Sequence, residues 1–339
     1  MITNREKKGK YYVIAFAVLL VIVFIASIST GRYPISFREV VWVIFGSITG
    51  AEQTWSDEMA LVIFRIRMPR VIAGAMIGAG LSAAGAAFQG LFRNPLVSPD
   101  VLGASAGAGF GAAVMILLGM NHVMISASAF ICGIIAVGAA YIISTRARRN
   151  PTLGMVLAGI MISSLFNSGT SFIRLVGDPN NVLPAITFWL MGSLSGVREE
   201  SLIWAAVPIL GGILVIFLLR WKLNLLTMGD DEARGMGLNT KIMRVVIVCA
   251  ATMITAASVA ISGLIGWVGL VIPHFARLLV GYDYRVMMPV TVLMGASFMM
   301  LVDNLSRTIA TAEIPLGILT AFVGAPFFLY LILDRGNRV

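Results

Sequence analysis

Charged residues are scarce in this chain. They make up only 12% of the 339 residues, whereas hydrophobic residues make up 58%. A typical soluble domain has about twice that share of charge, because it has a polar surface to cover. The apolar residues also form long uninterrupted runs, which suit a bilayer and are unfavourable in water. The composition therefore excludes a soluble enzyme and a disordered tail, and it predicts a membrane protein with several spans.

Features of several other protein classes are missing as well. The two cysteines, Cys132 and Cys249, lie in apolar runs, so no disulfide scaffold is expected. The chain has no Walker A or metalloprotease motif, so we expect neither an ATPase nor another enzyme. His122 and His274 are far apart, and we expect no bound metal or other cofactor. The net charge of +9 lies in short segments between apolar runs, which does not favour a nucleic-acid partner.

The apolar runs predict an all-α membrane protein of about ten transmembrane helices, since one span needs roughly 20 apolar residues. We expect a single transmembrane domain over residues 1–339, with a retained first span because no clear cleavage site follows it. Two long uncharged stretches each hold two spans, with breaks near Gly119 and Gly263. The predicted spans cover residues 11–28, 71–92, two helices between 101 and 145, 153–173, 202–219, two helices between 245 and 276, 287–302 and 316–333.

The segments between the runs predict the orientation in the membrane. Lys and Arg concentrate in residues 5–10, 146–149 and 220–244, and such short basic segments lie on the cytoplasmic side. Both termini are then cytoplasmic. Residues 179–197 are uncharged but contain Pro184 and Gly192, so we predict a short helix on the external side rather than a span.

Glycine occurs 35 times and gathers in the second and third spans. Gly74 and Gly78 form a G-x-x-x-G motif, and Gly103, Gly107 and Gly111 form two more in register. Small residues at this spacing let two helix backbones approach closely within a membrane. The same segments fit the loose dinucleotide pattern, but no strand or acidic residue supports it. We therefore expect tight helix packing here.

Asp303 is the main charged residue within a span, and Arg307 follows four residues later on the same helix face. An acidic group inside the membrane is a candidate relay for ion-coupled transport. Mutual neutralisation of the two charges near the external surface is the alternative. The near absence of other acidic groups at mid-membrane favours an energy source outside this chain.

The cytoplasmic segment 222–244 predicts a short helix outside the membrane. Gly229 can begin it, since the first turn then carries Asp230, Asp231 and Glu232, which suit the positive end of the helix dipole. Gly237 can end it. Such a short helix between two glycines is a candidate docking site for a soluble partner.

Several longer motifs, each different, follow one another along almost the whole chain. They are R-M-P-R at 67–70, R-N-P-L-V-S-P at 93–99, L-G-A-S-A-G-A at 102–108, L-A-G at 157–159, the segment 229–237, G-L-V-I-P-H at 269–274, E-I-P-L-G at 313–317 and G-A-P at 324–326. With these motifs the chain resembles the FecCD-type permease subunits of type II ABC importers for iron-siderophore complexes, haem and cobalamin.

The resemblance implies a permease homodimer with two cytoplasmic ATPase subunits, which bind the ATP, and an external substrate-binding protein. It implies a pore on the dimer axis, lined by spans three, five, eight and ten, in the plasma membrane of a bacterium or archaeon. It also implies three sets of site residues. Docking of the binding protein is assigned to Arg67, Arg70 and Arg307, which are expected to be exposed; the cytoplasmic gate to Asn94, Leu96, Thr152 and Leu153; and coupling to the ATPase to Gly229, Asp230, Glu232, Ala233, Arg234 and Gly237.

The expected cargo is an iron chelate, with haem or a corrinoid next. An ion-coupled secondary carrier that works alone by alternating access is the alternative function. The two functions differ in their energy source, since only the importer depends on nucleotide hydrolysis by a separate protein.

Overall fold

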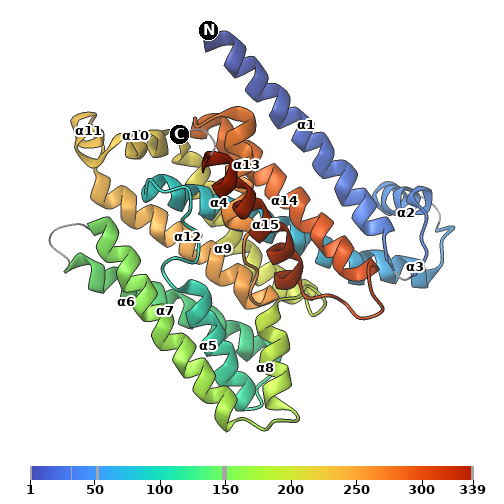
Figure 1. The fold of residues 1–339 in the computed structure, drawn as a ribbon. Helices are drawn as coiled ribbons and strands as arrows, with labels where there is room; N and C mark the ends of the chain where they lie inside the picture. The colour runs from blue at the N-terminus through green and yellow to red at the C-terminus, as the bar shows by residue number, and fades with distance from the viewer. Residues whose placement is uncertain (1, 32, 51–52, 147–150, 337–339) are drawn as a thin grey trace.

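The computed structural model describes residues 2–31, 33–50, 53–146 and 151–336, and these residues form helices with no strand among them. Figure 1 shows the helices gathered around the central helix α4. In chain order the helices are α1 (Ile2–Ser29), α2 (Phe37–Thr49), α3 (Asp57–Leu61), the π-helix η1 (Val62–Arg67), α4 (Met68–Leu91), α5 (Ala104–Leu117), α6 (His122–Thr145), α7 (Pro151–Val176), α8 (Val182–Met191), α9 (Glu199–Leu218), α10 (Arg220–Met228), α11 (Asp230–Gly235), α12 (Thr240–Ser262), α13 (Val268–Val280), α14 (Tyr284–Thr308) and α15 (Leu316–Gly336).

Each predicted span coincides with a helix of the structure. Among the described residues, seven helices are long and apolar enough to cross a membrane: α1, the continuous α3–η1–α4 helix, α6, α7, α9, α12 and α14. The other predicted spans are the shorter apolar helices α5, α13 and α15. The all-α prediction is confirmed. The short helix predicted within 179–197 is also present, as α8.

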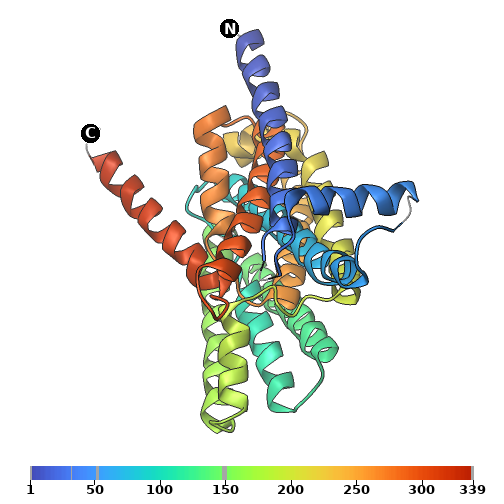
Figure 2. The same cartoon turned by 90° about the vertical axis from the view of Figure 1, so that its right-hand side faces the viewer.

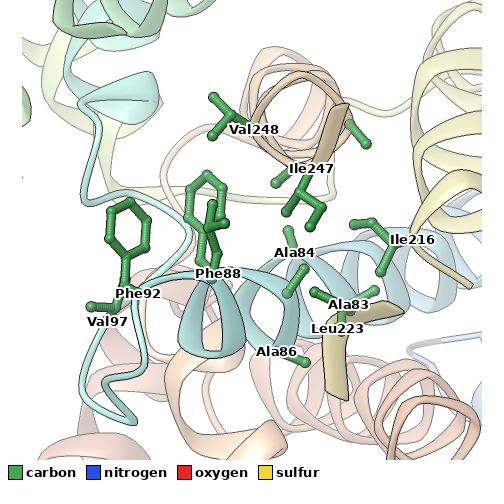
Figure 3. Packing of buried hydrophobic residues seen from close by; sticks show 14 of the residues in the cluster. Ala83, Ala84, Ala86, Phe88, Phe92, Val97, Ile216, Leu223, Ile247 and Val248 are labelled. Atoms are coloured by element: carbon green, nitrogen blue, oxygen red, sulfur yellow. The ribbon is translucent and has the colours of Figure 1, made fainter. Parts of the chain in front are cut away.

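Helix α4 is buried by its neighbours over most of its length, with 89% of its apolar window inside the protein. It packs against α9, α12, α13 and α14. Two close backbone approaches bring the partners together, because a Cβ on Gly78 would lie 2.2 Å from the Gly295 carbonyl oxygen and one on Gly85 would lie 1.8 Å from that of Gly269. Figure 3 shows Phe88 on this helix beneath Val248, in a core of small and large apolar side chains.

The glycine motif of α5 performs the packing role expected of it. A Cβ on Gly107 would lie 2.4 Å from the Cys132 carbonyl oxygen, and one on Gly111 would lie 2.5 Å from that of Ser128. Both acceptors belong to α6. Helices α5 and α6 therefore pack with their backbones in contact, as the spacing predicts.

The segment between the first two spans holds elements that the sequence analysis does not predict. Helix α2 begins with a capping box, in which Ser36 and Glu39 each bond the other's backbone N–H. Figure 2 shows α2 lying sideways to α1, outside the main bundle. The π-helix η1 continues directly into α4, so the second span starts earlier than residue 71.

Helices α7 and α15 lie at the periphery and expose apolar side chains. Only 22% of the apolar window of α7 is buried. Figure 2 shows α15 diverging from the bundle toward the C-terminus. Each of these helices therefore has a long apolar face that this chain alone does not cover; the exposed side chains include Leu157, Met161, Leu165 and Phe172 on α7 and Phe322 and Leu329 on α15.

Candidate coupling, gate and docking sites

We call α10 and α11 together the coupling segment. The predicted short helix is present as α11, with Gly229 at its start at φ 139°. Gly237 follows its end at φ 82°, a conformation that favours glycine, and its N–H donates to the Arg234 carbonyl at 2.9 Å. Asp231 and Glu232 lie in the first turn with Asp230, where negative charge is favourable. The prediction of a capped helix between two glycines is confirmed.

The base of the coupling segment is fixed to the membrane helices. Leu223 of α10 is fully buried in the core beside α4. The Asn224 side chain donates to Asp283 at 2.8 Å and accepts from the N–H of Tyr284 at 2.9 Å. Hydrogen bonds from Arg285, and to a lesser extent from Asn224, hold the pKa of Asp283 below its ordinary value. Helix α10 is therefore attached to the start of α14.

The predicted coupling residues divide into an inner and an outer group. Asp230 pairs with Arg244 of α12 at 3.0 Å, and Ala233 is fully buried, so these two residues face the protein. Glu232 and Arg234 are exposed, although the Arg234 Nε donates to Thr240 at 3.2 Å. The outer surface of α11 is thus polar and acidic on a base that is held in place.

Exposed methionines border this acidic surface. Met228 ends α10 with 62% of its surface exposed, and Met236 follows α11 with 48% exposed. Between them the Asp231 side chain is almost fully exposed. A surface of carboxylates flanked by flexible apolar side chains can contact a complementary protein groove.

The predicted gate residues Asn94 and Leu96 lie in the turn after α4. The Asn94 side chain accepts a hydrogen bond from the N–H of Leu96 at 2.9 Å, and Arg93 has a positive φ of 51°. Leu96 is 61% exposed, whereas Val97 beside it is buried in the core. The turn therefore holds one apolar side chain outward on a fixed backbone.

The other half of the predicted gate lies at the start of α7. Leu153 is 54% exposed, and the side chain of Thr152 lies outside the described residues. The turn after α4 meets α7 at Gly159, where a Cβ would lie 2.2 Å from the Val101 carbonyl oxygen. The two predicted halves of the gate therefore belong to elements that pack against each other at Gly159.

All three arginines predicted to dock an external protein are buried. Arg67 is 4% exposed, and Arg70 and Arg307 are each 8% exposed. Arg70 lies between two carboxylates, 2.9 Å from an oxygen of Asp303 and 2.9 Å from one of Glu313. The expectation that these arginines are exposed is wrong, because their guanidinium groups bind acceptors of the same chain.

These residues form an outer charge cluster that joins α1, α4 and α14. Arg67 donates to the Ile28 carbonyl at 2.7 Å, and Arg307 donates to the Thr30 carbonyl at 2.9 Å. The Nε of Arg307 lies 3.1 Å from Asp303, which confirms the pairing of these two residues. A relay for ion-coupled transport needs a carboxylate that can change partners, and Asp303 is buried between two guanidinium groups.

An apolar cavity of about 690 Å³ lies between α8, the turn before α13 and α15. Trp267, Ile318 and Phe322 contribute to its lining. No cluster of His, Cys, Asp or Glu that could hold a metal occurs in the described part of the chain. The cavity therefore offers an apolar wall rather than a set of ligands.

Trp267 has a strained backbone at the edge of this cavity. Its φ is 68° and ψ is −33°, and the N–H of Val268 donates across it to the Gly266 carbonyl at 2.8 Å. This is the rarer, strained form of the three-residue γ-turn. The Trp267 side chain packs on α15 at Gly324, where a Cβ would lie 2.6 Å from it. Sequence reasoning missed this residue, since nothing in its neighbourhood marks a positive φ at a tryptophan.

The comparisons with known proteins agree with this architecture. The model of the FecCD transport family matches residues 19–334. The chain is 37% identical to the molybdate import system permease protein MolB of Haemophilus influenzae, over 94% of this chain and 95% of that protein. It is 38% identical to the cobalamin import system permease protein BtuC of Halobacterium salinarum, over 82% of this chain and 75% of that protein.

A solved structure gives the same result for the fold. A metal-chelate-type ABC transporter in an inward-facing conformation superposes with a TM-score of 0.84 at 36% identity, covering 95% of this chain and 98% of that chain. The residues matched by the family model, 19–334, include all the sites described above. This chain belongs to the FecCD transport family and is an ABC transporter permease.

Proposed function

We propose that this chain is the membrane subunit of an ATP-driven importer and that its coupling segment receives the motion of a separate cytoplasmic ATPase. The observation that carries this proposal is α11, an acidic helix outside the bundle on a base held by buried side chains. The chain has no Walker A motif, so hydrolysis takes place in the partner. Relatives named as import system permeases support the same assignment.

The contacts of the coupling segment define a route for the motion. The pair between Asp230 and Arg244 links α11 to α12, and the bonds of Asn224 link α10 to α14. Both α12 and α14 pack against the buried helix α4. A push on α11 would therefore move α12 and α14 together, and α4 with them.

We further propose that two copies of the chain form the working unit. The uncovered apolar faces of α7 and α15 suit a second copy, and the apolar cavity beside α15 then opens toward a path between the copies. Asn94, Leu96, Thr152 and Leu153 would close this path at the cytoplasmic end. We propose that both termini lie in the cytoplasm, which the basic segments favour, and that the membrane is that of a bacterium or archaeon, as the family resemblance implies.

The cargo that we propose is an iron chelate, with haem or cobalamin as the next candidates. An apolar wall with no ligand cluster suits a bulky metal complex that passes without being held tightly. The relatives widen the range of cargoes, because one of them is named for molybdate, which the sequence analysis did not include. An external binding protein would select among these compounds.

We propose an indirect role for the outer charge cluster in docking. Because its arginines are saturated by carboxylates and carbonyls of this chain, we propose that they fix the surface on which the binding protein docks. Docking contacts would then come from exposed neighbours such as Arg65. Breaking the cluster would weaken docking indirectly, through the shape of that surface.

Uptake into vesicles tests the importer. Vesicles that contain this chain, its ATPase and the binding protein should accumulate radiolabelled ferric siderophore only when ATP is enclosed with the ATPase. Vesicles that contain this chain alone should accumulate nothing under a proton or sodium gradient. Gradient-driven uptake by the chain alone would contradict the proposal and establish the secondary carrier.

A further inference from the structure

A second cavity, of about 490 Å³, lies between the start of α1 and the start of α14. We call it the inner groove. It lies beside the base of the coupling segment, with which it shares Asp283 and Arg285, and away from the gate and docking sites. Its lining residues are Gly9, Lys10, Val13, Ile14, Asp283, Arg285 and Val286.

The floor of the inner groove is a close contact between two helices. A Cβ on Gly9 would lie 2.5 Å from a methyl carbon of Val286, so α1 and α14 touch at this level. The helices pack along much of their length beyond it. The groove is therefore a fixed feature of the α1–α14 pair.

The charged and the apolar lining residues lie at different levels along the groove. Lys10 and Arg285 lie at its cytoplasmic end, since both helices enter the membrane from that side in the proposed orientation. Val13, Ile14 and Val286 follow one turn or less further into the membrane. This order of cationic and then apolar groups matches the headgroup and acyl chain of a phospholipid in the inner leaflet.

The positive charge of the groove exceeds its negative charge. Among the lining residues that the structure describes, Asp283 is the one carboxylate, and Arg285 already binds it at 2.7 Å. Lys10 is exposed and adds a second cation on the opposite wall. The balance of +1 over these three described side chains favours an anionic headgroup over a zwitterionic one.

An interfacial aromatic residue completes the site. The Arg285 guanidinium lies over the ring of Trp221 of α10, 4.9 Å from its centroid. Trp221 is 51% exposed, and tryptophan is enriched at the level of lipid headgroups. Arg285 is thus held between a carboxylate and an aromatic ring, with the inner groove beside it.

We propose that the inner groove binds an anionic phospholipid of the inner leaflet, whose phosphate lies between Lys10 and Arg285 and whose acyl chain runs along Val13 and Ile14. Basic pockets between transmembrane helices on the cytoplasmic side are suited to such lipids. A free phosphate would share the cationic contacts but would leave the apolar part of the groove empty. The bound lipid would also lie next to Asp283, which holds α10 through Asn224.

Retention of lipid by the purified full-length chain tests this site. The purified chain in detergent is mixed with equal amounts of phosphatidylglycerol and phosphatidylcholine. Native mass spectrometry then counts the molecules of each lipid that stay bound to the chain. We expect wild type to retain phosphatidylglycerol preferentially. Lys10→Gln should lower that preference about fivefold, the effect expected of one cation near an anionic headgroup. Ile14→Trp should lower it as well, because it fills the apolar part and leaves both cations in place.

Two controls separate this site from general attraction of anions. Lys241→Gln removes an exposed cation at the start of α12, outside the groove, and should leave the preference unchanged. Glycerol phosphate should not displace the bound lipid. Equal retention of the two lipids by wild type, equal losses in Lys10→Gln and Lys241→Gln, or displacement by glycerol phosphate would each overturn the proposal. The measurement reads lipid binding alone, so its result is independent of the importer function.

Discussion

Helix α4 and the coupling segment are built with the same residue types and use them in opposite ways. The glycines of α4 allow backbone contact, as at Gly85, whereas Gly237 after α11 supplies a positive φ. The arginine at the start of α4, Arg70, is buried between carboxylates, whereas Arg234 on α11 is exposed. Surroundings, and not residue type, therefore decide whether a charge holds the fold or meets a partner.

The difference has an energetic consequence. A buried charge that loses its partner keeps the full cost of its transfer from water, whereas an exposed charge that loses its partner is solvated. Substitutions in α4 should therefore change the stability of the protein, and those on the outer surface of α11 should change its interaction with the ATPase.

Loss of Arg70 should give the largest loss of stability. Arg70→Ala leaves the buried Asp303 and the half-buried Glu313 without their shared partner. Removal of one member of a buried ion pair costs about 3–5 kcal/mol. The free energy of unfolding is measured by denaturant titration in detergent micelles.

The exposed pair of Arg65 and Glu199 provides the matched control. Arg65→Ala removes the same side chain from the same side of the protein, and an exposed pair contributes about 1 kcal/mol or less. Equal losses in the two variants would show that the outer charge cluster does not hold α4.

A methyl group at Gly85 should have the next largest effect. The Cβ of Gly85→Ala would collide with the Gly269 carbonyl and push α13 away from α4. Overpacking of this kind costs about 1–3 kcal/mol. Thermal unfolding in detergent measures the loss. Gly138→Ala on α6 is the control, since a Cβ there meets open space and alanine favours a helix, so this variant should be as stable as wild type or more so.

Charge reversal on the outer surface of α11 should affect partner binding and lower stability by about 1 kcal/mol or less, because a lysine in the first turn meets the positive end of the helix dipole. Glu232 is exposed, and Glu232→Lys should weaken binding of the ATPase up to about fivefold, as expected for loss of an exposed charge contact. The affinity is measured with the purified ATPase at low salt. Glu200→Lys reverses an exposed acidic residue at the start of α9, on the side predicted to be external, and should not change that affinity. A loss of stability in Glu232→Lys as large as that in Gly85→Ala would break the division between the two regions.

The sequence allowed the helices to be predicted better than their surroundings. A membrane span needs about 20 apolar residues, and its backbone must be hydrogen-bonded within a helix. The long apolar runs therefore allowed the spans and their breaks to be located. The two glycines of α11 could be assigned because helix ends have local signals. Local signals also indicated that Asp303 and Arg307, four residues apart, would pair.

Burial could not be predicted in the same way. Nothing near Arg70 in the sequence reveals that Asp303 and Glu313 will enclose it, because both partners lie more than 230 residues away. The strained turn at Trp267 also depends on a distant contact, with α15. Helix α2 was missed because the charged residues of this segment indicated only that it does not cross the membrane, and a short amphipathic helix outside the main bundle was not considered.

The weakest effect should come from acid at the base of the coupling segment. The pKa of Asp283 is lowered from 3.8, first by its hydrogen bond with Arg285. Its stabilising contribution is therefore complete above about pH 4 and is lost as the pH falls through its lowered value in the folded protein. Protonation would release Arg285 from Asp283 and shift the contact of Arg285 with Trp221.

The emission of Trp221 can report this change. With the other five tryptophans replaced by phenylalanine, the Trp221 spectrum should stay constant from pH 7 to about pH 4 and shift below it. Asp283→Asn should remove the pH dependence, because its side chain does not titrate there. A shift that persists in Asp283→Asn would assign the acid effect to another group and would leave α10 attached independently of this carboxylate.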